Sequence, residues 1–452
     1  MTGILGSQVL SRDRLAGRLR GAAAGSPALL VAQAGVFVVS TAATIALSQR
    51  NSVPAFAAFA RWNTCYVLAY AATETWAILL LLGGEGDPGT AGGWLDPAVR
   101  ALALLRGALV GGLCVIGAAW AFDGARLLVA AALGVLVAFA TAWADVCRTA
   151  AIARGRVSGA AGADLVAGVV AAGGLLLLLH RPTGGGLDFL IFFAVLMGAR
   201  AVGQSFPGGG RPRVARLVSL RRPLAVLWRR NYPYTAVVTL ARNVDNVVVS
   251  AVFGPVALGL YARSFSLLIG PVVQLSTAIA PLAWRQLLRA SPASRTDVAP
   301  ASRTEVVDRW FRVLTVPAYG LVLVSTVGAS RLVPIVLGPQ WVPAVPAIGL
   351  LALCGAALVL QLPALWAAQT GDRGLRPWAF AACELLPLAA LGACAPLGFH
   401  TALVTYTAVS LAATAALVMV GLGGRPTVRL GRLVALGGLP VLAVAIRLLG
   451  LS

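Results

Sequence analysis

Apolar runs of roughly twenty residues recur along the whole chain, separated by short connections rich in arginine, glycine and proline. An α-helix rises about 1.5 Å per residue, so about twenty apolar residues cross the hydrocarbon core of a bilayer. Inside that core every backbone N–H and C=O group must be bonded within the chain, which a helix achieves by itself. We therefore expect an all-α integral membrane protein with about 12–13 transmembrane helices.

The expected spans, read from the run of apolar residues in each, are 27–48, 54–83, 99–121, 125–145, 161–180, 187–206, 233–254, 256–282, 311–329, 342–368, 377–397, 400–422 and 432–450. The longest basic connection, 207–232, separates six spans from the next six. Two bundles of six helices around a central cavity are typical of secondary transporters.

This division predicts five regions. They are a cytoplasmic basic N-terminus (1–26), an N-terminal six-helix bundle (27–206), a basic cytoplasmic inter-lobe linker (207–232), a C-terminal six-helix bundle (233–422) and an additional C-terminal helix (423–452). The last helix either crosses the membrane or lies on its surface.

The charge of the chain is strongly basic, with a formal net charge of +21, and every basic residue is an arginine. In a soluble protein such a charge would suggest nucleic acid. Here 59% of the residues are hydrophobic and only 11% are charged, and the arginines lie mostly between the apolar runs. That pattern predicts membrane topology and contact with anionic lipid headgroups, with no nucleic-acid partner.

Orientation follows from the arginines in the short connections, because these concentrate on the cytoplasmic side. Starting with a cytoplasmic N-terminus, one side collects the arginines of the N-terminus, of 207–232 and of 283–310, and further ones after the fourth, tenth and twelfth spans. The other side has Arg50, Arg126, Arg181 and Arg331. We therefore predict a multi-pass protein of the cytoplasmic membrane with its N-terminus in the cytoplasm.

Signatures of enzymes and metal sites are missing from the sequence. It has six scattered cysteines, no C-x-x-C pair and two histidines, and it contains no P-loop, H-E-x-x-H or G-x-S-x-G motif. We expect no metal site, no cofactor and no catalytic residue, so the chain is not predicted to be an enzyme. Outer connections too short for a catalytic domain argue against a polytopic glycosyltransferase or polymerase.

Charged residues at bilayer depth are costly unless they face a partner or a water-filled cavity, which makes them the first candidates for a substrate site. Arg242, Asn243, Asp245 and Asn246 lie within one and a half turns of the seventh span. Arg242 and Asp245 could simply neutralise one another at i and i+3. Four polar residues in one central turn favour a polar cavity over that structural pairing.

Other charged residues in the spans fall into two groups. Arg263, Glu384 and Glu74 lie deep, and we expect Arg263 and Glu384 to face inward, whereas for Glu74 a cavity-facing and a structural role are equally good explanations. Those nearer to span ends are Arg61, Arg106, Arg200 and Asp164. We interpret Arg61, Arg200 and Asp164 mainly as snorkelling to the membrane surface, and Arg106 as ambiguous.

Two segments resemble a known family. ARNVDNVVVSAVFGPVALGLYARSFSLLIGPVVQLSTAIAPLAWRQL (241–287) contains a polar turn at Asp245, a G-x-x-x-L-G-x-Y connection (Gly254, Leu258, Gly259, Tyr261) and Pro281. RLVPIVLGPQWVPAVPAIGLLAL (331–353) contains an apolar-G-x-x-W-x-x-A motif, followed later by Gly371-Asp372. Both are similar to the polysaccharide-export branch, with its O-antigen flippase-type proteins, of the multidrug/oligosaccharidyl-lipid/polysaccharide exporter superfamily.

The resemblance implies two six-helix bundles around a cavity that opens alternately to either side of the membrane. It further implies a polyprenyl-pyrophosphate-linked saccharide as substrate, held by cationic cavity residues, and coupling to an ion gradient or the membrane potential. By position it carries over only Arg242 and Asp245. The first connection between spans fits the family loosely, and the thirteenth span is a departure from it.

A lipid-linked saccharide flippase for cell-surface polysaccharide synthesis is the first hypothesis. Its expected partners are the lipid-linked saccharide and membrane lipids, with glycan polymerase and glycosyltransferases as further candidates. A multidrug/cation antiporter of the same superfamily is the nearest rival hypothesis and predicts acid-dominated cavities. A polytopic glycan-synthesis enzyme and a non-transporting scaffold for glycan assembly are two further hypotheses.

Overall fold

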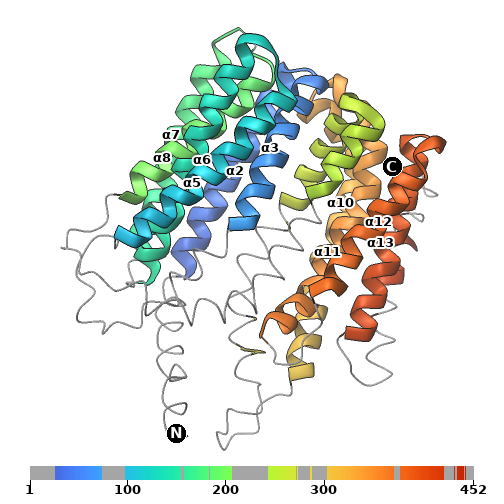
Figure 1. Cartoon of the computed structure of the whole chain (residues 1–452). Helices are drawn as coiled ribbons and strands as arrows, with labels where there is room; N and C mark the ends of the chain where they lie inside the picture. Colours follow the sequence, from blue (N-terminus) through green and yellow to red (C-terminus); the bar gives the residue numbers. More distant parts are fainter. Residues whose placement is uncertain are drawn as a thin grey trace, which may run out of the picture.

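The computed structural model describes residues 26–73, 97–153, 157–182, 184–205, 243–270, 303–370 and 377–421, and also 272, 283, 286, 287, 432, 435–441 and 443. Two groups of long helices lie beside one another (Figure 1). The first group, the N lobe, consists of α2 (Ser26–Arg50), α3 (Val53–Thr73), α5 (Pro97–Ala121), α6 (Gly124–Ala153), α7 (Val157–Leu179) and α8 (Gly186–Ser205).

The second group, the C lobe, begins with a helical segment, Asn243–Gly270, drawn yellow-green in Figure 1. It continues with α10 (Arg303–Val336), the 3-10 helix η1 (Pro339–Ala344), α11 (Val345–Thr370), α12 (Pro377–Ala393), the short η2 (Ala395–Leu397) and α13 (Phe399–Gly421). Within each lobe the helices pack as neighbours, with α5 on α6 and α8 on α6 in the N lobe and α10 on α11 and α12 on α13 in the C lobe.

The segment Asn243–Gly270 is a helical hairpin, although it is helical throughout. Sixteen positions along one straight helix would separate Asp245 from Tyr261 by about 24 Å. The Tyr261 hydroxyl nevertheless donates a hydrogen bond of 2.6 Å to Asp245. The chain therefore reverses between them, and it does so at Gly254, whose φ of 81° lies in the left-handed region that glycine tolerates. Two spans were predicted here, 233–254 and 256–282, and the described part contains a half of each.

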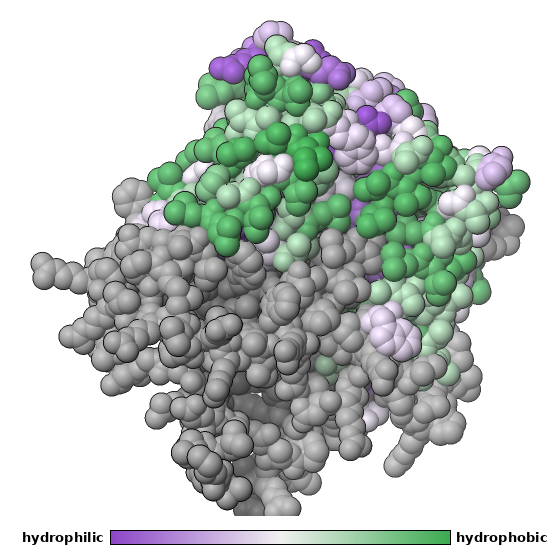
Figure 2. Space-filling view, in the orientation of Figure 1, coloured by the Kyte–Doolittle hydropathy of each residue, from purple (hydrophilic) through white to green (hydrophobic). Residues whose placement is uncertain are grey.

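Besides the hairpin Asn243–Gly270, seven helices among the described residues are long and apolar enough to cross a membrane, and the shorter apolar helix Trp378–Ala393 accompanies them. Many large apolar side chains on these helices are exposed, such as Ile116, Leu128 and Leu177. Figure 2 shows hydrophobic surface over both lobes, with hydrophilic residues gathered at the end remote from the grey part. In a membrane protein this exposed apolar surface faces lipid, so the predicted all-α membrane fold is confirmed.

The helix bounds differ from the expected spans in one informative place. The expected span was 311–329, but α10 already begins at Arg303 and runs through Val336. Thirty-four residues of helix extend about 51 Å, which is longer than a bilayer core of about 30 Å. The charged first turns of α10 therefore project beyond the membrane as helix.

The additional C-terminal helix packs against the C lobe in its described part. Leu436 and Leu439 are buried in the same core cluster as α10 side chains, and the Tyr319 hydroxyl of α10 donates a 2.9 Å hydrogen bond to the carbonyl of Ala435. Arg432 forms an ion pair with Asp308 of α10. These contacts make the described residues, 432, 435–441 and 443, part of the helical bundle.

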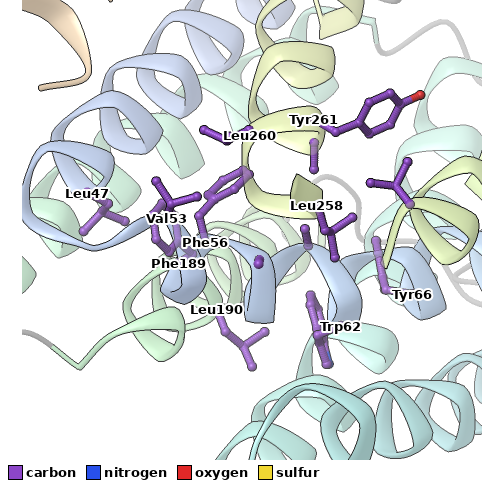
Figure 3. Packing of buried hydrophobic residues seen from close by; sticks show 14 of the residues in the cluster. Leu47, Val53, Phe56, Trp62, Tyr66, Phe189, Leu190, Leu258, Leu260 and Tyr261 are labelled. Carbon is purple, nitrogen blue, oxygen red and sulfur yellow. The ribbon is translucent and has the colours of Figure 1, made fainter. Parts of the chain in front are cut away.

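One core cluster crosses from lobe to lobe. It joins Phe56 and Trp62 of α3 and Phe189 of α8 to Leu258 and Tyr261 of the hairpin (Figure 3). Along α3 the rings of Phe59, Trp62, Tyr66 and Tyr70 stack at successive centroid distances of 6.1, 5.6 and 5.8 Å. Small residues let the α3–α5–α6 helices approach: a methyl group on Gly134 would lie 2.9 Å from both Cys114 and Trp62.

Candidate functional site

The structure separates the predicted cavity residues into two places. Asp245 and Glu384 line one small pocket inside the C lobe. Arg263 lies instead at the contact between the lobes, against Phe56 of α3. Asn243 and Asn246 flank Asp245 on the hairpin, whereas Arg242 and Glu74 lie outside the described residues.

The pocket between the hairpin, α11, α12 and α13 combines two carboxyl groups with hydroxyl and thiol groups. Its lining includes Asp245, Glu384, Tyr406, Ser410 and Cys354. Its internal volume is about 10 Å³, close to the smallest space that holds one water molecule. A space of this size, lined by two carboxyl groups, suits a proton or a small monovalent cation.

Asp245 is held firmly in this pocket. Its carboxylate accepts a 2.6 Å hydrogen bond from the Tyr261 hydroxyl and a 2.7 Å hydrogen bond from the backbone N–H of Asn246, and the residue is 2% exposed. The Tyr261 ring packs edge-to-face on Tyr406, with centroids 6.5 Å apart. Because Tyr261 belongs to the second arm of the hairpin, this hydrogen bond ties the two arms together.

Arg263 is the least compensated charge in the described residues. It is 2% exposed, its Nε and Nη2 atoms are buried without a hydrogen-bond partner among those residues, and none of the ion pairs found there includes it. Its guanidinium carbon lies 5.5 Å from the centre of the Phe56 ring, a cation–π contact. A desolvated guanidinium with free N–H groups favours an anion as its partner.

Both residues lie at the same depth. Asp245 stands nine residues before the hairpin turn at Gly254, and Arg263 stands nine residues after it. At about 1.5 Å per residue each lies about 13 Å from the turn. The hairpin therefore places one carboxyl and one guanidinium group at the same level on its two arms.

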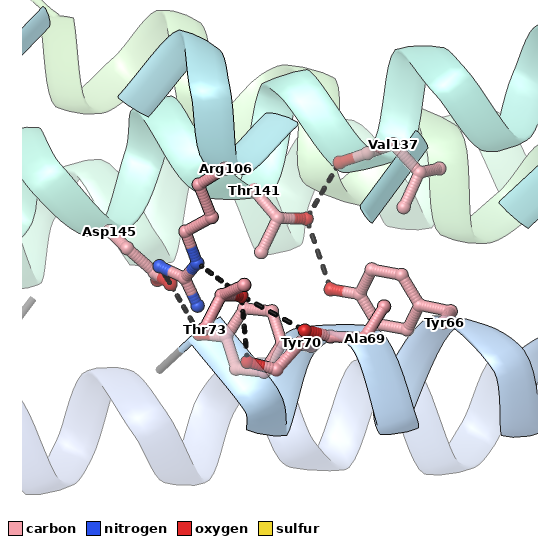
Figure 4. Close-up of polar contacts among 8 residues, drawn as sticks. All are labelled: Tyr66, Ala69, Tyr70, Thr73, Arg106, Val137, Thr141 and Asp145. Carbon is pink, nitrogen blue, oxygen red and sulfur yellow. Dashed lines mark hydrogen bonds and ion pairs between the residues drawn. The ribbon is translucent and has the colours of Figure 1, made fainter. Parts of the chain in front are cut away.

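Arg106 of α5 forms a structural network inside the N lobe (Figure 4). It pairs with Asp145 of α6 at 3.1 Å, donates a 3.1 Å hydrogen bond to Thr73 and stacks 4.3 Å from the Tyr70 ring. The Tyr70 hydroxyl also donates to Asp145. This network resolves the ambiguity of Arg106 in favour of a buried ion pair. The sequence offered no signal for it, because α3, α5 and α6 each contribute to it.

Asp164 and Arg200 were expected to snorkel, and that expectation is wrong. Asp164 is 1% exposed and lies between Arg200 of α8, at 3.0 Å, and Arg148 of α6, at 3.3 Å. Gln204 donates a further hydrogen bond of 3.2 Å to the same carboxylate. A charge near a helix end turns inward when neighbouring helices bring it a partner, because pairing offsets the cost of leaving water.

Arg61 links the lobes. Its Nε donates a 3.0 Å hydrogen bond to the Ser250 hydroxyl of the hairpin, and its guanidinium lies 5.6 Å from the Trp120 ring. It therefore binds across the lobe contact in place of the expected snorkelling.

Known proteins resemble this chain in two ways. Residues 230–346 match the family model described as "Polysaccharide biosynthesis protein". That stretch contains Asp245, Arg263 and η1. The match spans the first of the two segments that carry the family resemblance, 241–287, and reaches into the second, 331–353. The resemblance predicted from the sequence is thereby confirmed.

Solved structures of the superfamily share the fold. A MATE transporter in complex with MaL6 has a TM-score of 0.57 at 11% identity, covering 94% of this chain and 97% of that one. An inward-facing multidrug resistance MATE transporter has a TM-score of 0.53 at 11% identity, covering 91% and 95%. A transporter of the superfamily from Pyrococcus furiosus, described as having a binding pocket of reverse polarity that suggests a different function, has a TM-score of 0.55 at 12% identity, covering 94% and 97%. No curated protein sequence matches the chain.

At these identities the structural matches establish the fold of the superfamily and leave the substrate to the site itself. The described residues form a multi-pass helical membrane protein with two bundles and the fold of these transporters. Within it the segment with the family match carries both Asp245 of the carboxylate pocket and Arg263.

Proposed function

We propose that this protein is a flippase that moves a polyprenyl-pyrophosphate-linked oligosaccharide or polysaccharide precursor across the cytoplasmic membrane. The observation that carries the proposal is the Arg263 guanidinium at the contact between the lobes, which has two buried N–H-bearing atoms without a hydrogen-bond partner among the described residues. A pyrophosphate offers this guanidinium the oxygens that it lacks. The family match over 230–346, to polysaccharide biosynthesis proteins, supports the same class of substrate.

In this proposal the two lobes part around the saccharide and pyrophosphate, while the polyprenyl chain stays in the lipid beside them. The sequence contains no P-loop for nucleotide hydrolysis, so the proposal calls for a coupling ion. The pocket of Asp245 and Glu384 is the proposed place for that ion, because its two carboxyl groups and Tyr406 hydroxyl supply oxygen ligands or a protonation site.

The arginine distribution supports a cytoplasmic N-terminus in the cytoplasmic membrane. Substrate supply from the cytoplasmic leaflet then requires glycosyltransferases on that side, and product use requires a polymerase or transferase on the other. Arg242, Asn243, Asn246 and Glu74 stay proposed cavity residues.

A multidrug/cation antiporter is the second candidate function. The acidic pocket of Asp245 and Glu384 favours it, because a cationic drug and a coupling ion both bind carboxylates, and MATE transporters share the fold. The antiporter gives no role to a desolvated arginine at the lobe contact, which would repel a cationic drug. We therefore rank it second.

The test measures the sidedness of lipid-linked saccharide in a deletion strain, using a membrane-impermeant sugar-labelling reagent on spheroplasts and inverted vesicles. The strain should accumulate the saccharide on the cytoplasmic face and lose surface glycan. The native gene should restore both, Arg263→Lys should restore them in part, and Arg263→Met should fail.

A matched control is Arg331→Met, which removes an exposed arginine near the end of α10. It should behave like the native protein. Unchanged sidedness in the deletion strain, together with increased sensitivity to cationic drugs, would reject the flippase in favour of the antiporter.

A further inference from the structure

The two lobes are joined at one end by side chains that bind the backbone of the opposite lobe. Gln340 of η1 donates a 3.0 Å hydrogen bond to the carbonyl of Ser48, and the Trp341 indole N–H donates to the same carbonyl at 3.1 Å. In return, Gln49 of α2 donates to the carbonyl of Val336 of α10 at 2.8 Å. We call these hydrogen-bonded groups, with Phe56, the inter-lobe seal.

Phe56 is the centre of the inter-lobe seal. Its ring meets Trp341 of the C lobe edge-to-face at 5.7 Å and Phe189 of the N lobe at 5.2 Å. The Arg263 guanidinium lies over the same ring at 5.5 Å. Phe56 thus contacts both Trp341, a hydrogen-bonding residue of the inter-lobe seal, and Arg263, the proposed anion-binding arginine.

The motif residues that carry the family resemblance gather at this contact. Gly338 of the G-x-x-W motif has a φ of 101°, and the backbone N–H of Trp341 bonds to its carbonyl at 3.1 Å, forming the turn that presents the indole. Gly259 of the G-x-x-x-L-G-x-Y connection faces the start of α3, where an added methyl group would lie 2.6 Å from the Val53 carbonyl oxygen. Both motifs therefore serve the closure of one lobe on the other.

We propose that Gln340 and Trp341 are a latch that keeps the lobes closed at this end, and that Arg263, through its contact with Phe56, couples release of the latch to an anion in the cavity. This end contains the turns after α2 and α7, which the arginine distribution predicts to face outside. The coupling half of the inference rests on the proposed function, and the latch half does not.

The physical argument for coupling is a competition for one guanidinium. In the closed state the positive charge of Arg263 is stabilised by the face of the Phe56 ring, and two of its N–H-bearing atoms have no partner among the described residues. An anion that takes those N–H groups neutralises the charge and draws the side chain from the ring. The cation–π contact, which then weakens, stabilises only the closed arrangement.

The latch is tested by distance measurements in the full-length protein in detergent or nanodiscs. In a background without the six native cysteines, spin labels are attached through His180→Cys and His400→Cys, two exposed positions on different lobes. Pulsed electron–electron double resonance then gives the distribution of distances between the two labels, and from it the populations of the closed and open conformations.

Trp341→Phe keeps a ring against Phe56 and removes the indole donor, and Gln340→Leu removes the amide donor. Each lost hydrogen bond should raise the open-to-closed ratio by about two- to tenfold, and the double variant by more. The matched control is Trp310→Phe, which removes an indole hydrogen bond of 3.1 Å to Gln286 within the C lobe. A double variant with the native distance distribution, or a control that opens equally, would overturn the latch.

Coupling is tested with farnesyl pyrophosphate as the probe, following its binding by calorimetry and the label distances in the same samples. Binding should raise the open population severalfold in the native background, and Arg263→Met should bind at least about tenfold more weakly and show no shift. Binding with unchanged distances would overturn the coupling and leave the proposed function standing. Absence of binding would overturn both the coupling and the pyrophosphate assignment, whereas the latch is decided by the variants alone.

Discussion

Replacing Gly259 by alanine should open the lobes without unfolding them. Gly259 lies on the hairpin arm that leads to Arg263, and an added methyl group would lie 2.6 Å from the Val53 carbonyl oxygen and 2.7 Å from its Cγ1 atom. Real Cβ atoms essentially never approach a neighbour so closely, and one of the two neighbours is backbone, which yields little. Such overpacking costs about 1–3 kcal/mol.

That cost falls on the closed state alone, because Val53 begins α3 in the N lobe and Gly259 belongs to the C lobe. Once the lobes part at this end, the methyl group has room. A difference of about 1–3 kcal/mol corresponds to about a five- to 150-fold increase in the open-to-closed ratio. The label pair at positions 180 and 400 reports this ratio directly.

The control is Gly198→Ala in α8, where an added methyl group meets nothing within 4 Å. It should leave the distance distribution as it is, because alanine is a better helix former than glycine and creates no clash. If Gly259→Ala gives the native distribution, the close approach of α3 and the hairpin does not limit opening, and the predicted clash is refuted.

The buried charges give three further predictions. Tyr261→Phe removes a hydroxyl that donates to Asp245. Transport in vesicles should then need a larger ion gradient to reach the native rate, while substrate binding stays near native. An unchanged dependence of transport on the ion gradient would show that the pocket is not the coupling site. Arg106→Met should lower the free energy of unfolding by about 3–5 kcal/mol, because it leaves the Asp145 carboxylate without its cation. The double variant with Asp145→Leu should recover most of that loss in thermal unfolding. Equal losses in the single and double variants would contradict a paired network. Asp164→Asn should lower the unfolding temperature even though it keeps the shape of the side chain, since Arg148 and Arg200 then face one another without an anion. A native unfolding temperature would mean that water solvates these three side chains.

In the hairpin, the local sequence predicts the two spans, whereas the hydrogen-bond partner of Asp245 depends on the tertiary structure. The sequence predicts two spans on either side of residue 255, because the apolar runs are interrupted by Gly254 and Pro255. It also selects Asp245 as a polar residue at bilayer depth. The partner of Asp245, Tyr261, stands sixteen positions away, and only the reversal of the chain brings its hydroxyl within 2.6 Å.

For the arginines too, the sequence predicts one property and the tertiary structure decides another. Their placement between spans indicates topology, since that depends on a count along the chain. Whether an arginine inside a span snorkels, pairs or remains unpaired depends on what the neighbouring helices present at its height. Asp164 meets two arginines from other helices, and Arg263 meets the ring of Phe56.

The sequence by itself determined the class of fold, the positions of most spans and the family resemblance, because these depend on apolar run length, helix rise and local motifs. The tertiary structure decided which charges are structural ion pairs, that the deep carboxyl groups and Arg263 occupy separate places, and that the glycine and tryptophan motifs close one lobe on the other. The physical reason is that helix packing in a membrane is set by side-chain shape and polar pairing between segments far apart in the chain, for which apolar periodicity carries no signal.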